Sequence, residues 1–343
     1  MSDKGTYTCL LTTDGQPEHV TCDIGSEKLG ISAGKMLWRI NYADLKDIRL
    51  INYHLFLTTA SGKLKLSELG RDTESFFENL WSAYMARSKE ALFVEGTPLY
   101  EGVGDYAFTE QGTRQHGIAK VEMLDDALVI CPHDYLARRI PLCFALEPVE
   151  EDFGITLTLD TGDTYRISRI GRDTQAVFEK MVKAREAVAK RWQQAHRELD
   201  RQLEERLGER RHNFDRMRGY GCTMLAGLYR TDGDGFWFAG LKDGRAAVEL
   251  VTDEQTATYL YLFDNAAGVS PAEGARNFEH ALRHAMESVG LHREVIYADI
   301  TDKPLYRMTV ERSYHLRFLR EHNIGRVIHN AAWDRNIADF LAG

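Results

Sequence analysis

The first part of the chain alternates between apolar and polar positions in short runs, which are separated by residues that favour turns. The runs are YTCLLTT, KLGIS, MLWRINY, DIRLI, YHLFLTT and KLKLS. Alternation over about four to seven residues, with β-branched and aromatic members, is typical of antiparallel strands. From Phe77 onwards the apolar positions recur every three or four residues, at Leu80, Trp81 and Tyr84. This spacing predicts that one amphipathic helix follows the strands.

The same order of elements occurs again about one hundred residues later. Residues 64–89 and 165–190 are identical at 10 of 26 aligned positions, including an unbroken Gly-Arg-Asp-Thr. Upstream, Arg39-Ile40 aligns with Arg139-Ile140. A repeat of this length indicates a duplicated structural unit. We call residues 1–95 the first module and residues 96–190 the second module.

The residues shared by the two copies predict the same local structure in each. We expect the glycine to form a turn, and the aspartate two residues later to cap the helix by accepting from free backbone amides. We expect the phenylalanine that follows to lie in the core, and the arginine of the motif to lie on the surface. The predicted structural residues are Gly70, Asp72 and Phe77 in the first module and Gly171, Asp173 and Phe178 in the second.

Two further segments extend the pattern of strands followed by a helix. These segments are Ile40-Asn41-Tyr42 and Ile140-Pro141-Leu142. With the element order and the duplication, they resemble the pleckstrin-homology-like (PH-like) superfold of bacterial PH-like and GRAM-like domains, in which such an Ile-x-Tyr or Ile-Pro-x segment leads into a corner strand. The resemblance implies two tandem small β-barrels, each closed by a C-terminal helix and without an intrinsic catalytic centre.

The same resemblance bears on ligands. PH-like domains that bind phosphoinositides use Lys and Arg in the first hairpin. The corresponding loops here, residues 12–19 and 109–116, contain a single basic residue, Arg114. We therefore expect the modules to bind protein, through the groove beside the helix or an exposed sheet edge.

A charged helix is predicted to continue from the second module through residues 191–217. Thirteen of these 27 residues are charged, and a narrow apolar line contains Trp192, Leu199, Leu203 and Leu207. Gly208 weakens the far end of the helix. A sparse stripe of this kind packs either on the same chain or on a second copy. A homodimer is therefore a possible outcome.

Residues 218–343 predict a C-terminal α+β domain of unknown type. The strand-like runs are CTMLAGLY, GFWFAGL, AAVELVT, TATYLYLF, EVIYADI, LYRMTVER and RVIH. Helices are expected from Pro271, over YHLRFLREH and around Trp333. Phe278-Glu279 follows Phe178-Glu179 by 100 residues, which leaves a divergent third PH-like copy open. The fold class is thus α+β, with two tandem barrels, a long charged helix and this domain.

Charge narrows the range of partners. The chain has 43 basic and 52 acidic residues, and its net charge of −9 divides into −2, −5 and −2 over residues 1–95, 96–190 and 191–343. Without a basic region it lacks the attraction that draws proteins to nucleic acid and anionic lipid. We expect no nucleic-acid partner, and phosphoinositide or membrane binding only if folding gathers scattered cations onto one face. These cations are Lys63, Lys65, Arg166 and Arg169.

Cysteines and the longest apolar stretches indicate a reducing, cytoplasmic location. The five cysteines are Cys9, Cys22, Cys131, Cys143 and Cys222, with no Cys-x-x-Cys pair, so we expect buried reduced thiols. No apolar stretch reaches the ~20 residues of a membrane span, and the N-terminal residues lack the pattern of a signal peptide.

Two clusters in the C-terminal domain are weak candidates for metal ligands. His280 and His284 are spaced four residues apart, but Ala281 stands where the metalloprotease motif has Glu. A zinc site there needs a third ligand such as His292 or Asp299. Asp232 and Asp234 lie among glycines, which suggests calcium, but the later loop ligands are missing and a hairpin turn explains them better.

These observations predict a function without a cofactor. Phosphate-binding glycine loops, a nucleophile elbow and a dinucleotide fingerprint are all missing from the sequence. We predict a non-catalytic cytoplasmic adaptor that binds protein through tandem PH-like modules. The alternatives are an enzyme or small-ligand or metal sensor with its site in residues 218–343, and peripheral lipid binding by the modules.

Overall fold

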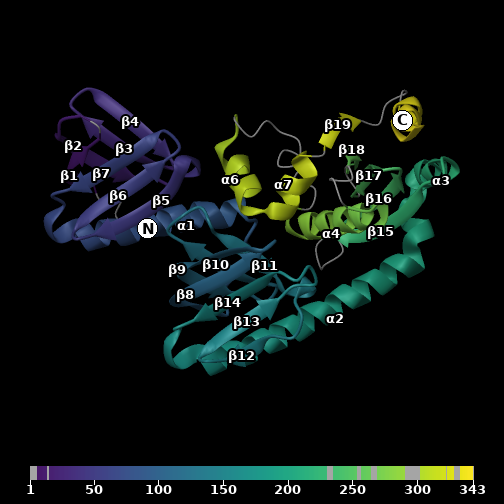
Figure 1. The fold of residues 1–343 in the computed structure, drawn as a ribbon, viewed down its shortest axis with the longest axis horizontal. Coiled ribbons are helices and arrows are strands. Elements are labelled where there is room, and N and C mark those ends of the chain that lie inside the picture. The colour runs from purple at the N-terminus through teal and green to yellow at the C-terminus, as the bar shows by residue number, and fades with distance from the viewer. Residues whose placement is uncertain are drawn as a thin grey trace.

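The protein is a mixed α+β structure with three antiparallel sheets and several helices (Figure 1). The computed structural model describes residues 6–13, 15–229, 235–252, 256–263, 269–289, 302–321, 323–327 and 333–342. Within these ranges, none of the helices is long and apolar enough to cross a membrane.

The first module contains seven strands followed by a helix. The strands are β1 (Thr6–Thr12), β2 (Glu18–Ile24), β3 (Lys28–Ala33), β4 (Met36–Asn41), β5 (Leu45–Ile51), β6 (His54–Thr59) and β7 (Gly62–Ser67), and the helix is α1 (Thr73–Ala91). The sheet order is β4-β3-β2-β1-β7-β6-β5, which makes β4 and β5 the edge strands. Alternate strand residues pack with Phe76, Leu80 and Tyr84 of α1 in one core.

The second module repeats this arrangement. Its strands are β8 (Tyr100–Glu110), β9 (Thr113–Met123), β10 (Ala127–Pro132), β11 (Arg138–Pro141), β12 (Val149–Glu151), β13 (Gly154–Thr158) and β14 (Thr164–Ser168), followed by the helix α2 (Thr174–Leu207). The order β11-β10-β9-β8-β14-β13-β12 is the order of the first sheet, strand for strand. The edges are accordingly β11 and β12.

The Gly-Arg-Asp-Thr segment forms the same helix entry in both modules. A 3-10 turn covers Gly70–Asp72 and Gly171–Asp173. Both glycines adopt a left-handed conformation, with φ of 60° and 75°, which explains their presence in each copy. The prediction of turn glycines is therefore confirmed.

The prediction that two aspartates cap the helices through their side chains is wrong. Asp72 and Asp173 do occupy the N-cap positions, but neither side chain makes a capping hydrogen bond. Each aspartate has helical backbone angles as the last residue of the 3-10 turn. A capping side chain requires an extended backbone at that residue. The next threonine instead donates to the glycine carbonyl, from Thr73 over 2.9 Å and from Thr174 over 3.1 Å.

The predicted core position in each helix is displaced by one residue. Phe76 and Val177 are buried, whereas Phe77 and Phe178 are only half-buried at the rim of their cores. Phe77 lies beside Trp81 and His133, with ring centroids 5.8 Å and 6.4 Å away. The expectation that Phe77 lies in the core of its own module is thus wrong, because it faces the second module.

The long charged helix crosses the expected boundary at residue 190. α2 continues to Leu207 and ends at Gly208, and a short helix, α3 (Arg211–Gly219), follows. Leu199 and Leu207 are buried in a core shared with the third sheet, and Leu203 packs at its rim. The apolar stripe is thus covered by the same chain, and it no longer argues for a homodimer.

The C-terminal domain is built on a five-stranded sheet. Its strands are β15 (Thr223–Tyr229), β16 (Gly235–Lys242), β17 (Arg245–Val251), β18 (Thr256–Leu262) and β19 (Asn323–Val327), in that spatial order. Its described helices are α4 (Pro271–Val289), α6 (Pro304–Arg312), α7 (Tyr314–Glu321) and α8 (Trp333–Ala342). α4 and α7 cover one face, and α3, α8 and the end of α2 cover the other. Burial on both faces explains continuous apolar runs such as GFWFAGL.

Most elements predicted for this domain are present. LYRMTVER is an exception, because it forms α6: Pro304 occupies the first turn, where proline favours a helix, and Met308 and Arg312 are buried on one face. EVIYADI lies outside the described residues. The described part of the third sheet has five strands in consecutive order, which differs from the seven-strand order of the modules.

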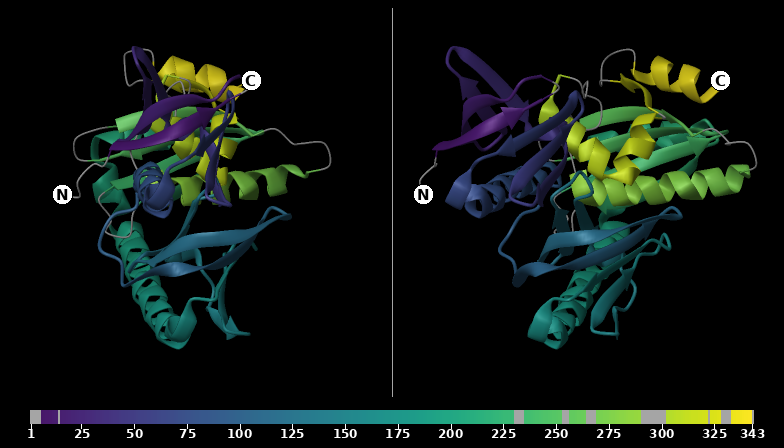
Figure 2. Two further views of the ribbon diagram at one scale, coloured as in Figure 1. Left: turned by 90° about the vertical axis from the view of Figure 1, so that its left-hand side faces the viewer. Right: turned by 60° about the vertical axis from the view of Figure 1, so that its left-hand side comes forward.

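The three parts of the chain pack closely around α1 and α6. Figure 2 shows from two sides that α6 and α7 lie between the first module and the third sheet. The buried Tyr84 of α1 lies at the junction: its hydroxyl is 3.0 Å from the carbonyl oxygen of Asp134 in the second module. The same hydroxyl accepts a hydrogen bond of 2.7 Å from Arg312 of α6. Burial raises the pKa of Tyr84 to about 12, so the hydroxyl stays protonated and can donate.

Candidate functional site

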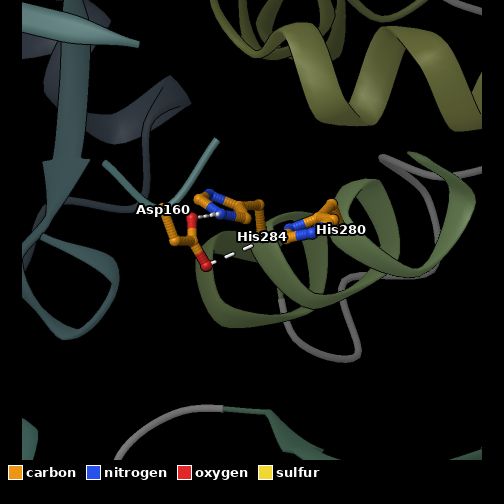
Figure 3. A group of neighbouring side chains, drawn as sticks. All are labelled: Asp160, His280 and His284. Carbon is orange, nitrogen blue, oxygen red and sulfur yellow. Dashed lines mark hydrogen bonds and ion pairs between the residues drawn. The ribbon is translucent and has the colours of Figure 1, made fainter. Parts of the chain in front are cut away.

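The strongest cluster of metal-ligating side chains lies between the second module and α4. Asp160 comes from the turn between β13 and β14, and His280 and His284 lie one helical turn apart on α4 (Figure 3). α4 uses Phe278 and Leu282 to pack on the third sheet. The histidines are thereby turned toward the second module, since residues four apart share a helix face.

The three side chains lie close together. Nε2 of His284 lies 2.8 Å from Oδ1 of Asp160, and Nδ1 of His280 lies 4.0 Å from Oδ2 (Figure 3). One donor atom from each residue lies within 4.8 Å of the other two. Nδ1 of His280 is itself buried and has no hydrogen-bond partner in the described part of the chain.

The His284 ring is held firmly by its surroundings. Its side chain is 3% exposed, and its ring stacks on Phe144 of the second module with centroids 4.0 Å apart. The His315 ring of α7 lies 4.3 Å away. His280 differs, because 45% of its side chain is exposed. The His284 ring is thus fixed in position, whereas the His280 ring has space to rotate.

The surroundings of the cluster shift the pKa values of Asp160 and His315. Burial would raise the pKa of Asp160, but the hydrogen bond and charge of His284 outweigh it and hold the pKa below its usual value. Burial, with the nearby His284, lowers the pKa of His315 to about 3. His315 is therefore a neutral imidazole at physiological pH.

A cleft adjoins the cluster. Its volume is about 470 Å³, and Asp160, His280 and His315 contribute to its wall. Gln111 and Asn277 add amide groups from the second module and from α4. The cleft therefore has room for water or a small molecule beside the three side chains.

The structure selects among the predicted metal candidates. It brings His280 and His284 together with Asp160, a ligand that sequence spacing did not suggest. The third ligands considered earlier, His292 and Asp299, lie outside the described residues, as do Asp232 and Asp234. Asp160 was missed because it is 124 residues from His284 and only the docking of two domains joins them.

A buried charge network fixes α4 beside this cluster. Arg139 of β11 donates two hydrogen bonds to Glu287 of α4, of 2.7 Å and 3.0 Å, and one of 2.7 Å to Asp126. The side chains of Arg139 and Glu287 are only 8% and 4% exposed. Charges buried in this way need their partners. The edge strand β11 is thereby tied to the C-terminal domain.

The equivalent edge strand of the first module, β4, is exposed rather than tied to another domain. Its burial pattern shows Met36, Leu37, Trp38 and Arg39 exposed. Neither β4 nor the preceding Lys35 makes an ion pair with any described residue. The other edge, β5, is covered, because Ile48 donates a backbone hydrogen bond of 2.9 Å to the carbonyl of His133 in the second module.

The cations considered for lipid binding are not gathered into one group of unpaired charges. Lys63 and Lys65 lie on β7 of the first sheet. Arg166 lies in β14 of the second module and Arg169 just after it, and they pair with Glu151 and Asp105 respectively.

The sequence matches no protein-family model and has no match among curated proteins.

Proposed function

We propose that the protein is a non-catalytic binding protein whose two modules are PH-like, and that the β4 edge of the first module docks an extended segment of a partner protein. The repeated order of seven strands followed by a helix supports the PH-like assignment. The observation that carries the docking proposal is the contrast between the bare β4 edge and the covered β11 edge.

Backbone geometry makes β4 suited to strand addition. β3 and β4 form a hairpin in which Ala33 pairs with Met36 across a two-residue turn. The closing pair of such a hairpin exchanges hydrogen bonds, and alternate pairs repeat this pattern. The amide and carbonyl groups of Leu37 and Arg39 therefore point away from β3. A partner strand would use them, as in β-augmentation.

Side chains define the chemistry of the partner. Leu37 is 57% exposed and Met36 is 54% exposed, which provides apolar area along the strand. Lys35 and Arg39 make this edge locally basic in a chain of net charge −9. Charge complementarity therefore favours an extended segment with alternating apolar residues and at least one Asp or Glu.

A screen with displayed random peptides tests the proposal. The full-length chain selects dodecapeptides from a phage library, and enriched peptides are then measured by fluorescence polarisation. We expect apolar, acidic peptides that bind the wild-type chain at micromolar Kd. Leu37→Pro removes an outward amide without breaking the sheet and should weaken binding by about tenfold or more. Arg39→Glu should do the same by repulsion.

Two controls keep the result specific to β4. Lys63→Glu reverses an exposed charge on β7 of the same module and should leave peptide binding unchanged. Peptides that bind the Leu37→Pro and Arg39→Glu variants as well as the wild type would overturn the proposal. A different outcome would assign this edge to membranes instead. In that case no peptide is selected, the wild-type chain floats with vesicles of phosphatidylcholine and phosphatidylserine in a salt-sensitive way, and Arg39→Glu does not float.

A further inference from the structure

We propose that Asp160, His280 and His284 form a binding site for one divalent transition-metal ion, which joins the second module to the C-terminal domain. The site is independent of the peptide-docking edge, because it uses different residues of different modules. It rests on four observations: the donor set, its spacing, the unsatisfied nitrogen of His280 and the adjoining cleft.

The donor set matches the chemistry of such ions. Two imidazole nitrogens and one carboxylate oxygen are ligands that Zn²⁺ and its first-row neighbours accept. Histidines four residues apart on a helix present their nitrogens to a single ion. Asp160 supplies the third ligand from the facing turn, and its carboxylate provides the negative charge that compensates a cation.

The spacing requires only a small adjustment. Bonds from zinc to nitrogen or oxygen are about 2.0–2.2 Å long, so two ligand atoms on one ion lie at most about 4 Å apart. The donor atoms now lie within 4.8 Å of one another. His280, with nearly half of its side chain exposed, can close the remaining distance by rotating. His284 stays in place between Phe144 and His315.

A purely structural role explains only part of the cluster. The hydrogen bond between His284 and Asp160 accounts for those two residues as a tie between domains. It leaves Nδ1 of His280 buried and without a hydrogen-bond partner in the described structure, 4.0 Å from the same carboxylate. An unpaired buried nitrogen carries a free-energy penalty. A metal ion would use this nitrogen together with the second carboxylate oxygen.

The cleft gives the ion an open side. Three protein ligands leave at least one coordination position, and the space of about 470 Å³ beside Asp160 and His280 admits water or an exchangeable ligand. Because no single domain holds all three ligands, metal binding is coupled to the docking of α4 on the second module. The bound ion should therefore stabilise the docked arrangement by mass action.

Titration of the full-length, chelator-treated chain with ZnCl₂ tests the proposal. We expect one Zn²⁺ per chain by calorimetry, a rise in Tm with added Zn²⁺, and visible absorption bands when Co²⁺ replaces it. His280→Ala is the decisive variant, because this side chain is half-exposed and makes no hydrogen bond among the described residues. It should fold normally and bind Zn²⁺ at least about 100-fold more weakly, because loss of a hydrogen-bond partner of a metal ligand already costs about 10–100-fold and this variant removes a ligand itself.

Matched controls separate this site from incidental binding to histidines. His116→Ala changes an exposed histidine on β9 of the second module and should leave affinity and stoichiometry unchanged. Asp160→Ala should also abolish binding. The proposal is overturned if the wild type binds no Zn²⁺ or if His280→Ala binds it with unchanged affinity. Peptide binding at β4 should be the same with and without Zn²⁺, so the two proposals can fail separately.

Discussion

The first and second modules have the same fold, but their equivalent edge strands, β4 and β11, have different surroundings. Both contain seven strands in one order and enter their helix through the same Gly-Arg-Asp turn. Arg39 and Arg139 occupy equivalent positions in the repeat. Arg39 is exposed on a bare edge, whereas Arg139 is buried in ion pairs with Glu287 and Asp126.

The difference shows that a duplicated unit can keep its core while its surfaces diverge in use. The first module and the C-terminal domain both dock on the second module, and they also contact each other through α6 (Figure 1). The β11 edge of the second module is used within the chain. The β4 edge of the first module pairs with no further strand in the described part of the chain. The position of each copy in the molecule therefore decides whether its edge strand is exposed or contacts another domain.

The helices that follow the two sheets, α1 and α2, also differ in what they cover. α1 has 19 residues and uses its outer face against the second module, where Lys89 pairs with Glu122 over 2.6 Å and Lys120 lies 4.6 Å above the Trp81 ring. α2 has 34 residues and continues past its own sheet to cover the third one. α1 thus contacts both the second module and α6 of the C-terminal domain, whereas α2 extends from its own module to the third sheet.

The largest expected effect comes from the equivalent arginines. Arg139→Ala leaves Glu287 buried without its partner and should lower the free energy of unfolding by about 3–5 kcal/mol. Arg39→Ala should change it by less than about 0.5 kcal/mol, because the side chain is exposed. Denaturant unfolding of both variants measures the difference. Equal effects would contradict the contrast between the two edges.

A similar effect is expected inside the first module. Phe76→Ala creates a cavity in a fully buried site and should cost about 3–5 kcal/mol of stability. Phe77→Ala removes a half-buried ring from the contact with the second module and should cost about 1–2 kcal/mol, in proportion to its smaller buried area. Thermal unfolding distinguishes the two variants. A larger loss of stability for Phe77→Ala than for Phe76→Ala would show that Phe77 is the core residue.

The smallest expected effect concerns the helix entries. A true side-chain cap contributes about 1 kcal/mol. Since Asp72 and Asp173 make no capping hydrogen bond, Asp72→Ala and Asp173→Ala should each cost less than about 0.5 kcal/mol, the remainder being attraction to the helix dipole. Adding salt should reduce even this loss. A loss of about 1 kcal/mol in both modules, insensitive to salt, would show that the carboxylates do cap the helices in solution.

Local sequence predicted the repeated elements well. Alternation indicated the strands around Leu55 and Leu57, and the spacing after Phe77 indicated a helix with Leu80 and Tyr84 inward. It misplaced the buried phenylalanine by one position, since Phe76 and Phe77 are both apolar and only contact with the second module distinguishes them. It also assigned LYRMTVER to a strand, although Pro304 favours the start of a helix.

The candidate site was only half visible in the sequence. The spacing of His280 and His284 identified two ligands, because residues four apart share a helix face regardless of the rest of the fold. The third ligand, Asp160, belongs to a turn of another domain and carries no local signal. The exposed β4 edge was likewise expected only as a general possibility, since MLWRINY reads the same whether or not a neighbour covers it.

The duplication, most of the described strands and helices, and the turn glycines Gly70 and Gly171 were predictable from the sequence, because they depend on short-range periodicity and backbone conformation. The burial of Arg139, the exposure of Arg39 and the meeting of Asp160 with His280 and His284 were not predictable in this way. Those outcomes depend on which surfaces dock, and docking is set by the summed packing and charge of whole domains rather than by any local pattern.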